Sequence, residues 1–272
     1  MTMTLKESAE GAGRNLYLLI DGAQVDAPML IYSYDDCPGF EQLYRQTPHQ
    51  SALEVSPCLV QPSDTSRLWE QESVWRSAGV AIESDADIQT LADHFRSLIS
   101  VRLPDQTFAY LRFYAPTQVD DLLSAFTPNE CIQFSGPVRK WHYFRPGSGW
   151  EALEVGILER RHEAREEGWF QLTDAHIQTI SARKKAKFIR TLVNNAGLPL
   201  TPENENRIRV LVDQGRRYGF RTEAELASYT EMATCYPEAI NQPCAQTILA
   251  NNGRPAYERL AELDHLVAQG GA

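Results

Sequence analysis

The clearest constraint on the fold is a change in character about two thirds of the way along the chain. From Thr173 onward the sequence contains no convincing strand and predicts only helices. Thr222-Glu-Ala-Glu225 has the spacing of a capping box, in which the side chains at both ends bond backbone N–H groups. The predicted helices cover residues 173–196, 202–218, a stretch from 222, about 238–250 and about 255–268.

The part before Thr173 alternates strand and helix patterns. Leu16–Ile20 is a buried strand candidate that ends at Asp21-Gly22, and Thr107–Tyr114 shows the clearest two-face alternation. The turn at Pro146-Gly-Ser-Gly149 predicts a hairpin that pairs 138–144 with 150–155. Further strands are expected at 55–60 and 79–82, and helices at about 64–78, 85–99 and 116–126.

This order predicts an α+β fold. We expect an N-terminal α/β lobe with a mixed β-sheet flanked by helices, followed by an all-α C-terminal lobe. The predicted boundaries are a flexible N-terminus over 1–14, an α/β domain over 15–150, a linker or hairpin over 151–172 and a helical domain over 173–272.

Charge and composition narrow the choice of partners and compartment. The formal net charge is −10, and residues 1–150 carry 11 Lys/Arg against 19 Asp/Glu. Because such a surface repels phosphate backbones, duplex nucleic acid is not an expected partner. The longest apolar run, Leu16–Ile20, is far short of the ~20 residues that span a bilayer. Five cysteines without a CxxC pair fit reduced thiols. These features predict a soluble, cytoplasmic protein.

A search for catalytic motifs finds no strong candidate. No phosphate-binding glycine loop is present, and neither a cofactor nor a metal is predicted. Ser148 lies between two glycines but lacks the outer glycines of a nucleophile elbow, so a turn is the preferred interpretation. Asp21 ends a strand, where it fits either a catalytic carboxylate or a turn acceptor. A hydrolase that uses Asp21 or Ser148 in a cleft between the lobes stays open as the alternative function.

A basic cluster lies within the first predicted C-terminal helix. It comprises Arg183, Lys184, Lys185, Lys187 and Arg190. The preferred interpretation is a solvated helix face, because charge runs usually face water. The alternatives are a contact for an acidic protein partner and a nucleic-acid contact, against which the net charge argues.

Several segments together resemble one family. The matching blocks are 16–24, Pro38-Gly-Phe-Glu-Gln-Leu-Tyr44, Ser56-Pro-Cys-Leu-Val60, 79–84, the dense stretch 91–114, and Ser135-Gly-Pro-Val-Arg139 with Trp141. In this order they resemble the effector chaperone or adaptor family of bacterial type VI secretion systems. Arg217-Tyr-Gly-Phe220, followed by Thr222-Glu-Ala-Glu-Leu226, is similar to the helical tail of that family.

The resemblance implies a cytoplasmic protein without enzymatic activity. Members of this family bind a toxic effector protein and help to load it onto the VgrG spike, sometimes through a PAAR tip. The resemblance therefore implies an effector and VgrG as partners, without nucleic acid or membrane. The shared blocks suggest a common task for the N-terminal lobe, and the variable C-terminal lobe is then the expected place for effector contacts.

Some polar residues in these blocks are candidates for special roles. They are Asp21, Gln24, Arg112, Arg139 and Trp141, to which the basic residues Arg183, Lys184 and Lys187 are added as candidate partner contacts. An internal role is preferred over a partner contact, for example Arg112 paired with an aspartate inside the lobe, because an arginine on a strand is seldom left unpaired.

Overall fold

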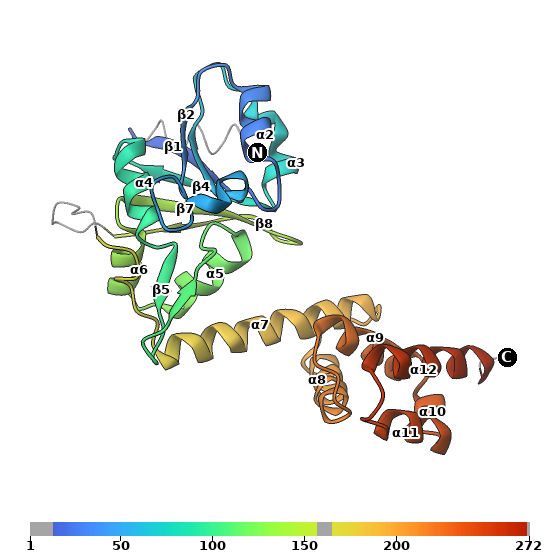
Figure 1. The fold of residues 1–272 in the computed structure, drawn as a ribbon. Helices are drawn as coiled ribbons and strands as arrows, with labels where there is room; N and C mark the ends of the chain where they lie inside the picture. The colour runs from blue at the N-terminus through green and yellow to red at the C-terminus, as the bar shows by residue number, and fades with distance from the viewer. Residues whose placement is uncertain (1–12, 157–164, 271–272) are drawn as a thin grey trace. The chain divides into compact units, whose positions relative to one another are not determined.

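The computed structural model describes residues 13–156 and 165–270, and the chain divides into two compact units. The first unit ends at Ile180 and the second begins at Ser181. Most of the predicted flexible N-terminus, and residues 157–164 of the predicted linker, lie outside the described residues. Figure 1 shows the strands in the first unit and the helical second unit. The predicted α/β lobe followed by an all-helical lobe is therefore confirmed.

A six-stranded sheet forms the centre of the first unit (Figure 1). All strand pairs within it are antiparallel, where the sequence analysis expected a mixed sheet. In spatial order its strands are β2 Gly39–Gln42, β3 Cys58–Gln61, β1 Asn15–Ile20, β4 Gly79–Ser84, β7 Val138–Arg145 and β8 Gly149–Glu154. β7 and β8 form the predicted hairpin. A separate two-stranded ribbon pairs β5 Ser100–Arg102 with β6 Phe108–Tyr110.

Each face of the sheet has its own core, because successive residues of a strand point to opposite faces. Tyr17 and Leu19 of β1 belong to one core, together with Phe95 and Trp141. Leu18 and Ile20 belong to the other, together with Trp75. The helices of this unit are α2 Ala27–Tyr34, α3 Glu72–Trp75, α4 Ile88–Arg96, α5 Pro116–Ala125 and α6 Pro128–Ser135, with 3-10 helices η1 Gln50–Val55 and η2 Leu68–Gln71.

Two predicted strands are shorter than expected. Within 107–114 only β6 is a strand, because a turn that begins at Arg112 leads the chain into α5. Within 55–60 the strand begins at Cys58. Pro57 has no N–H to donate to a sheet, and its carbonyl instead accepts from the N–H of Leu43.

Six helices make up the described part of the C-terminal region. Thr222 and Glu225 form the predicted capping box, and Thr201 caps the preceding helix. The single helix expected over 238–250 is two helices, because Pro243 starts a new first turn. The helices are α7 Asp174–Asn195, α8 Pro202–Arg217, α9 Glu223–Cys235, α10 Pro237–Ile240, α11 Pro243–Ala250 and α12 Ala256–Gly270.

The second unit has a core of its own. Ile189 and Val193 of α7 pack with Ile208 and Val212 of α8 and with Tyr229 of α9. Gly215 lets α8 approach α9 closely, since a Cβ atom there would lie 2.9 Å from Cδ1 of Tyr229. This tight packing holds α8 firmly against α9.

Candidate functional site

Asp21 is the centre of a polar network at the end of β1. Its side chain is fully buried, and its Oδ1 atom accepts a hydrogen bond of 3.0 Å from the N–H of Ala23. Its Oδ2 atom accepts from Nε2 of Gln24 at 3.1 Å. Gly22 follows because a Cβ atom there would lie 2.2 Å from the carbonyl oxygen of Ser56. The sequence-based interpretation of Asp21 as a turn acceptor is therefore confirmed.

Arg112 completes this arrangement by donating from Nη2 to Oδ2 of Asp21. The hydrogen bond to Asp21 raises the pKa of Arg112 above its ordinary value. The pairing of Arg112 with an aspartate inside the lobe is the internal role that the sequence analysis preferred. The Arg112 side chain is still 37% exposed, so this residue connects a buried carboxylate with the surface.

Three tyrosine hydroxyl groups extend the network from Arg112. The Tyr114 hydroxyl bonds to Arg112 and lies 2.6 Å from the hydroxyl of Tyr110, which also bonds to Tyr44. Burial raises the pKa values of Tyr44 and Tyr114, so both phenols stay neutral near pH 7. The His49 ring packs against Tyr110 with 5.7 Å between centroids. This connected set links the end of β1 to the β5–β6 ribbon.

The ribbon ends the network in an exposed aromatic edge, defined by Phe108–Tyr110. The Leu103 N–H bonds to the carbonyl of Thr107, and the Leu111 N–H bonds to that of Ile99. This alternation directs the backbone groups of Phe108 and Tyr110 away from β5. Their side chains are 60% and 43% exposed. Among the described residues β6 pairs with β5 on one side only. Its other edge, with the exposed side chains of Phe108 and Tyr110, can therefore contact another protein.

Arg139 and Trp141 lie apart from this network. Nε of Arg139 donates to Oδ2 of Asp85 at 2.7 Å. Trp141 is fully buried, and its Nε1 donates to Oγ of Ser135 at 2.9 Å. Its ring packs near Phe95 in the core. Trp141 therefore presents no surface to a partner, in contrast to its selection as a candidate contact.

Glu83 on β4 and His142 on β7 form a buried pair that no sequence pattern indicates. Glu83 is 1% exposed, and its Oε1 lies 2.8 Å from Nε2 of His142. Nη1 of Arg14 donates to the other carboxylate oxygen at 3.2 Å. Burial lowers the pKa of His142, and the hydrogen bond to Glu83 opposes this only in part. A neutral His142 thus donates Nε2–H to a carboxylate whose charge is balanced by Arg14.

Stability is expected to fall in mild acid because of His142. Its native pKa lies below the unfolded value of about 6.5, so the unfolded chain binds a proton that the native chain excludes. The free energy of unfolding should therefore decrease as pH falls below about 6.5. The measurement is urea unfolding between about pH 7.5 and pH 5.5, for the natural chain and for His142→Gln. The variant should show a weaker pH dependence, and equal slopes would contradict this assignment.

Asp21 and Ser148, the residues considered for the alternative hydrolase, both have hydrogen-bond partners within the first unit. Asp21 is occupied by Arg112, Gln24 and a backbone N–H. Ser148 is exposed in the β7–β8 turn, where its N–H bonds to the carbonyl of Arg145 at 3.1 Å. Among the described residues, no group of three or more His, Cys, Asp or Glu could hold a metal ion.

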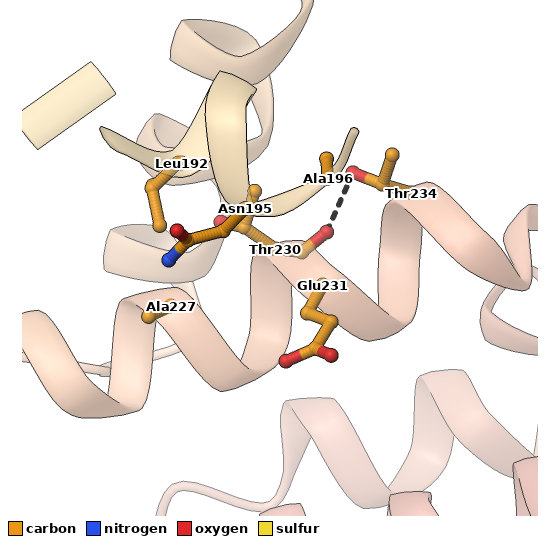
Figure 2. A pocket seen from close by; sticks show the side chains of 7 residues that line it. All are labelled: Leu192, Asn195, Ala196, Ala227, Thr230, Glu231 and Thr234. Carbon is orange, nitrogen blue, oxygen red and sulfur yellow. Dashed lines mark hydrogen bonds between the residues drawn. The ribbon is translucent and has the colours of Figure 1, made fainter. Parts of the chain in front are cut away.

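A hollow in the second unit is a poor small-molecule site (Figure 2). Its volume is only about 30 Å³, whereas ligand sites typically measure about 300–1,000 Å³. Thr234 donates to the carbonyl of Thr230 at 2.6 Å. Within the described ranges, the buried hydroxyl of Thr230 has no hydrogen-bond partner. The hollow is lined by Leu192, Asn195, Ala196, Ala227, Thr230, Glu231 and Thr234.

The predicted basic cluster lies on the part of α7 that belongs to the second unit. Lys184 is exposed, whereas Arg183 and Lys187 are half-buried. Nζ of Lys185 is 3.1 Å from Oδ1 of Asp213, and Nε of Arg190 is 3.1 Å from Oε1 of Glu205. The cluster is thus partly tied to α8 rather than fully solvated.

No helix among the described residues is long and apolar enough to cross a membrane.

Comparisons with known proteins find similarity in the N-terminal region of the chain. Residues 16–133 match the family described as "Domain of unknown function (DUF4123)". The chain is also 35% identical over 98 residues to "Accessory protein VasW" of Vibrio cholerae serotype O1. That stretch is 36% of this chain and 33% of the relative, so the chain spans about a third of the length of the relative it matches. No solved structure matches. These findings support the resemblance to the type VI secretion adaptor family.

Proposed function

We propose that this chain, in which residues 16–133 match the DUF4123 family, is a non-enzymatic adaptor for type VI secretion. It binds a toxic effector protein and promotes its loading onto the VgrG spike, with or without a PAAR tip. The observation that carries the proposal is the coincidence of the family match with similarity to an accessory protein. The family resemblance also leads us to propose a cytoplasmic location.

The arrangement of the first unit supports this proposal. The aromatic edge lies inside the matched region, and Tyr110 is held in place by the hydroxyl groups of Tyr44 and Tyr114. Arg102 stacks over the ring of Phe108 at 5.4 Å. Aromatic side chains that are fixed before binding lose little conformational entropy in an interface. We assign the aromatic edge to the partner shared by the family, the spike.

The adaptor function is tested by affinity purification of the tagged chain from cells that express the secretion machinery. We expect VgrG and one large toxin-like protein to be recovered together. Phe108→Ala should reduce VgrG recovery about tenfold or more, since central aromatic contacts commonly contribute 2 kcal/mol or more. Val74→Ala is the control, because Val74 is also exposed but lies on α3. Recovery of neither protein would contradict the proposed function.

A further inference from the structure

Charge is strongly segregated within the second unit. Residues 181–221 carry ten Lys/Arg against three Asp/Glu, whereas residues 222–272 carry two against seven. Asp213 contacts Lys185 and Arg216, and Glu205 contacts Arg190. The formal net charge is therefore +7 for residues 181–221 and −5 for residues 222–272. The basic residues lie on the part of α7 that belongs to the second unit, on α8 and in the turn after α8, in a chain whose net charge is −10.

Many of these basic side chains face water. α8 buries Ile208, Val212 and Gly215, so its other faces point away from the core. Arg209 and Arg216 are seven residues apart, about 10.5 Å along one stripe of the helix. The exposed basic residues of this region are Lys184, Arg190, Arg207, Arg209, Arg216, Arg217 and Arg221. We call the four exposed arginines of α8, Arg207, Arg209, Arg216 and Arg217, the basic face.

The basic face also has an apolar centre. Val210 is 53% exposed, and Arg217 follows it at a distance of seven residues, on the same stripe. The basic residues of α8 and of the turn after it are all arginines. Arginine presents a planar fork of donors that binds a carboxylate through two hydrogen bonds. Like charges at this density repel one another, so the face is costly unless a ligand of opposite charge binds it.

We propose that the basic face binds an acidic segment of the effector, with an apolar side chain of that segment packed on Val210. That the ligand belongs to the effector rests on the proposed function. That the ligand is acidic is inferred from charge complementarity alone. The second unit is a better match for a short acidic peptide than for nucleic acid, because residues 222–272 would repel a long polyanion.

The direct test uses a fluorescent twelve-residue peptide of Glu and Leu, a matched Gln and Leu peptide, and a twelve-nucleotide RNA. Binding to the full chain is measured by anisotropy at two salt concentrations. We expect the acidic peptide to bind more weakly at high salt, and the Gln peptide not to bind. The triple variant Arg207→Glu, Arg209→Glu, Arg217→Glu should lose at least tenfold in affinity. Equal binding by this variant, or tighter binding of the RNA, would overturn the proposal.

Two controls separate a lost contact from a lost fold. Replacing the same three arginines by lysine keeps the charge and should reduce affinity only a few fold, because the fork is lost. Arg45→Glu changes an exposed arginine of the first unit and should leave peptide binding unchanged. In cells, the triple glutamate variant should lose the effector but retain VgrG. If the natural chain recovered neither the effector nor VgrG, that result would contradict the proposed function instead.

Discussion

Replacing Asp21 with alanine is expected to lower the free energy of unfolding by about 3 kcal/mol, at the lower end of the range for breaking a buried ion pair. Asp21 is fully buried and accepts from Arg112, Gln24 and the N–H of Ala23. Removal of the carboxylate leaves these donors without their acceptor. The expected cost is not larger because Arg112 is partly exposed and can be solvated.

Urea unfolding at pH 7 measures this loss, with Asp105→Ala as the control. Asp105 also bonds backbone and hydroxyl donors, at Thr107, but it is exposed in a turn. Its replacement should cost less than about 1 kcal/mol. The double variant Asp21→Ala, Arg112→Met should cost less than the sum of its single changes. Equal losses for Asp21→Ala and Asp105→Ala would show that the network does not stabilise the first unit.

Replacing Trp141 with alanine is expected to cost about 3–5 kcal/mol, as for other large aromatic side chains removed from a core. The Trp141 ring is fully buried beside Phe95, and its Nε1 donates to Ser135. The substitution therefore leaves a cavity and an unpaired hydroxyl group. Thermal or urea unfolding measures the loss.

Two comparisons decide whether Trp141 acts through packing. Trp141→Phe keeps an aromatic ring and should lose less stability than Trp141→Ala. Phe108→Ala removes an aromatic side chain that is 60% exposed and should cost less than about 1 kcal/mol. If Trp141→Ala reduced partner binding and left stability unchanged, Trp141 would be a partner contact rather than a packing residue.

The second unit was largely predictable because its signals are local. Thr222 accepts from the backbone N–H of Glu225, as the predicted capping box requires. Thr201 accepts in the same way from the N–H of Asn204. Pro243 shows the limit, since one proline split a predicted helix into α10 and α11. Whether a proline divides a helix depends on whether the helical turn before it forms, and helix propensity alone does not determine this.

The first unit was less predictable where long-range contacts override local pattern. The alternation in 107–114 continues past β6, yet the chain turns at Arg112, whose side chain reaches Asp21 at the end of β1. α2 and β2 went unassigned, as did α6 despite its capping box at Thr127 and Glu130. Edge strands and short helices acquire most of their stability from tertiary packing.

The candidate site was predicted in part. An internal partner for Arg112 was expected, and Asp21 is that partner. The chain of hydroxyl groups through Tyr44, Tyr110 and Tyr114 was not foreseen, because it joins segments up to 70 residues apart that only the fold brings together. The sequence did not indicate the Glu83–His142 pair for the same reason. His142 lies on the predicted strand 138–144, and Glu83 directly follows the predicted strand 79–82.

The most direct test of the adaptor role is the amount of effector bound to the spike in cells with and without this chain. Tagged VgrG is purified from both, and the associated effector is quantified by mass spectrometry and normalised to the effector in the lysate. The adaptor account predicts at least a tenfold loss of spike-bound effector without the chain, restored by a plasmid copy. An unchanged amount of effector on the spike would contradict it.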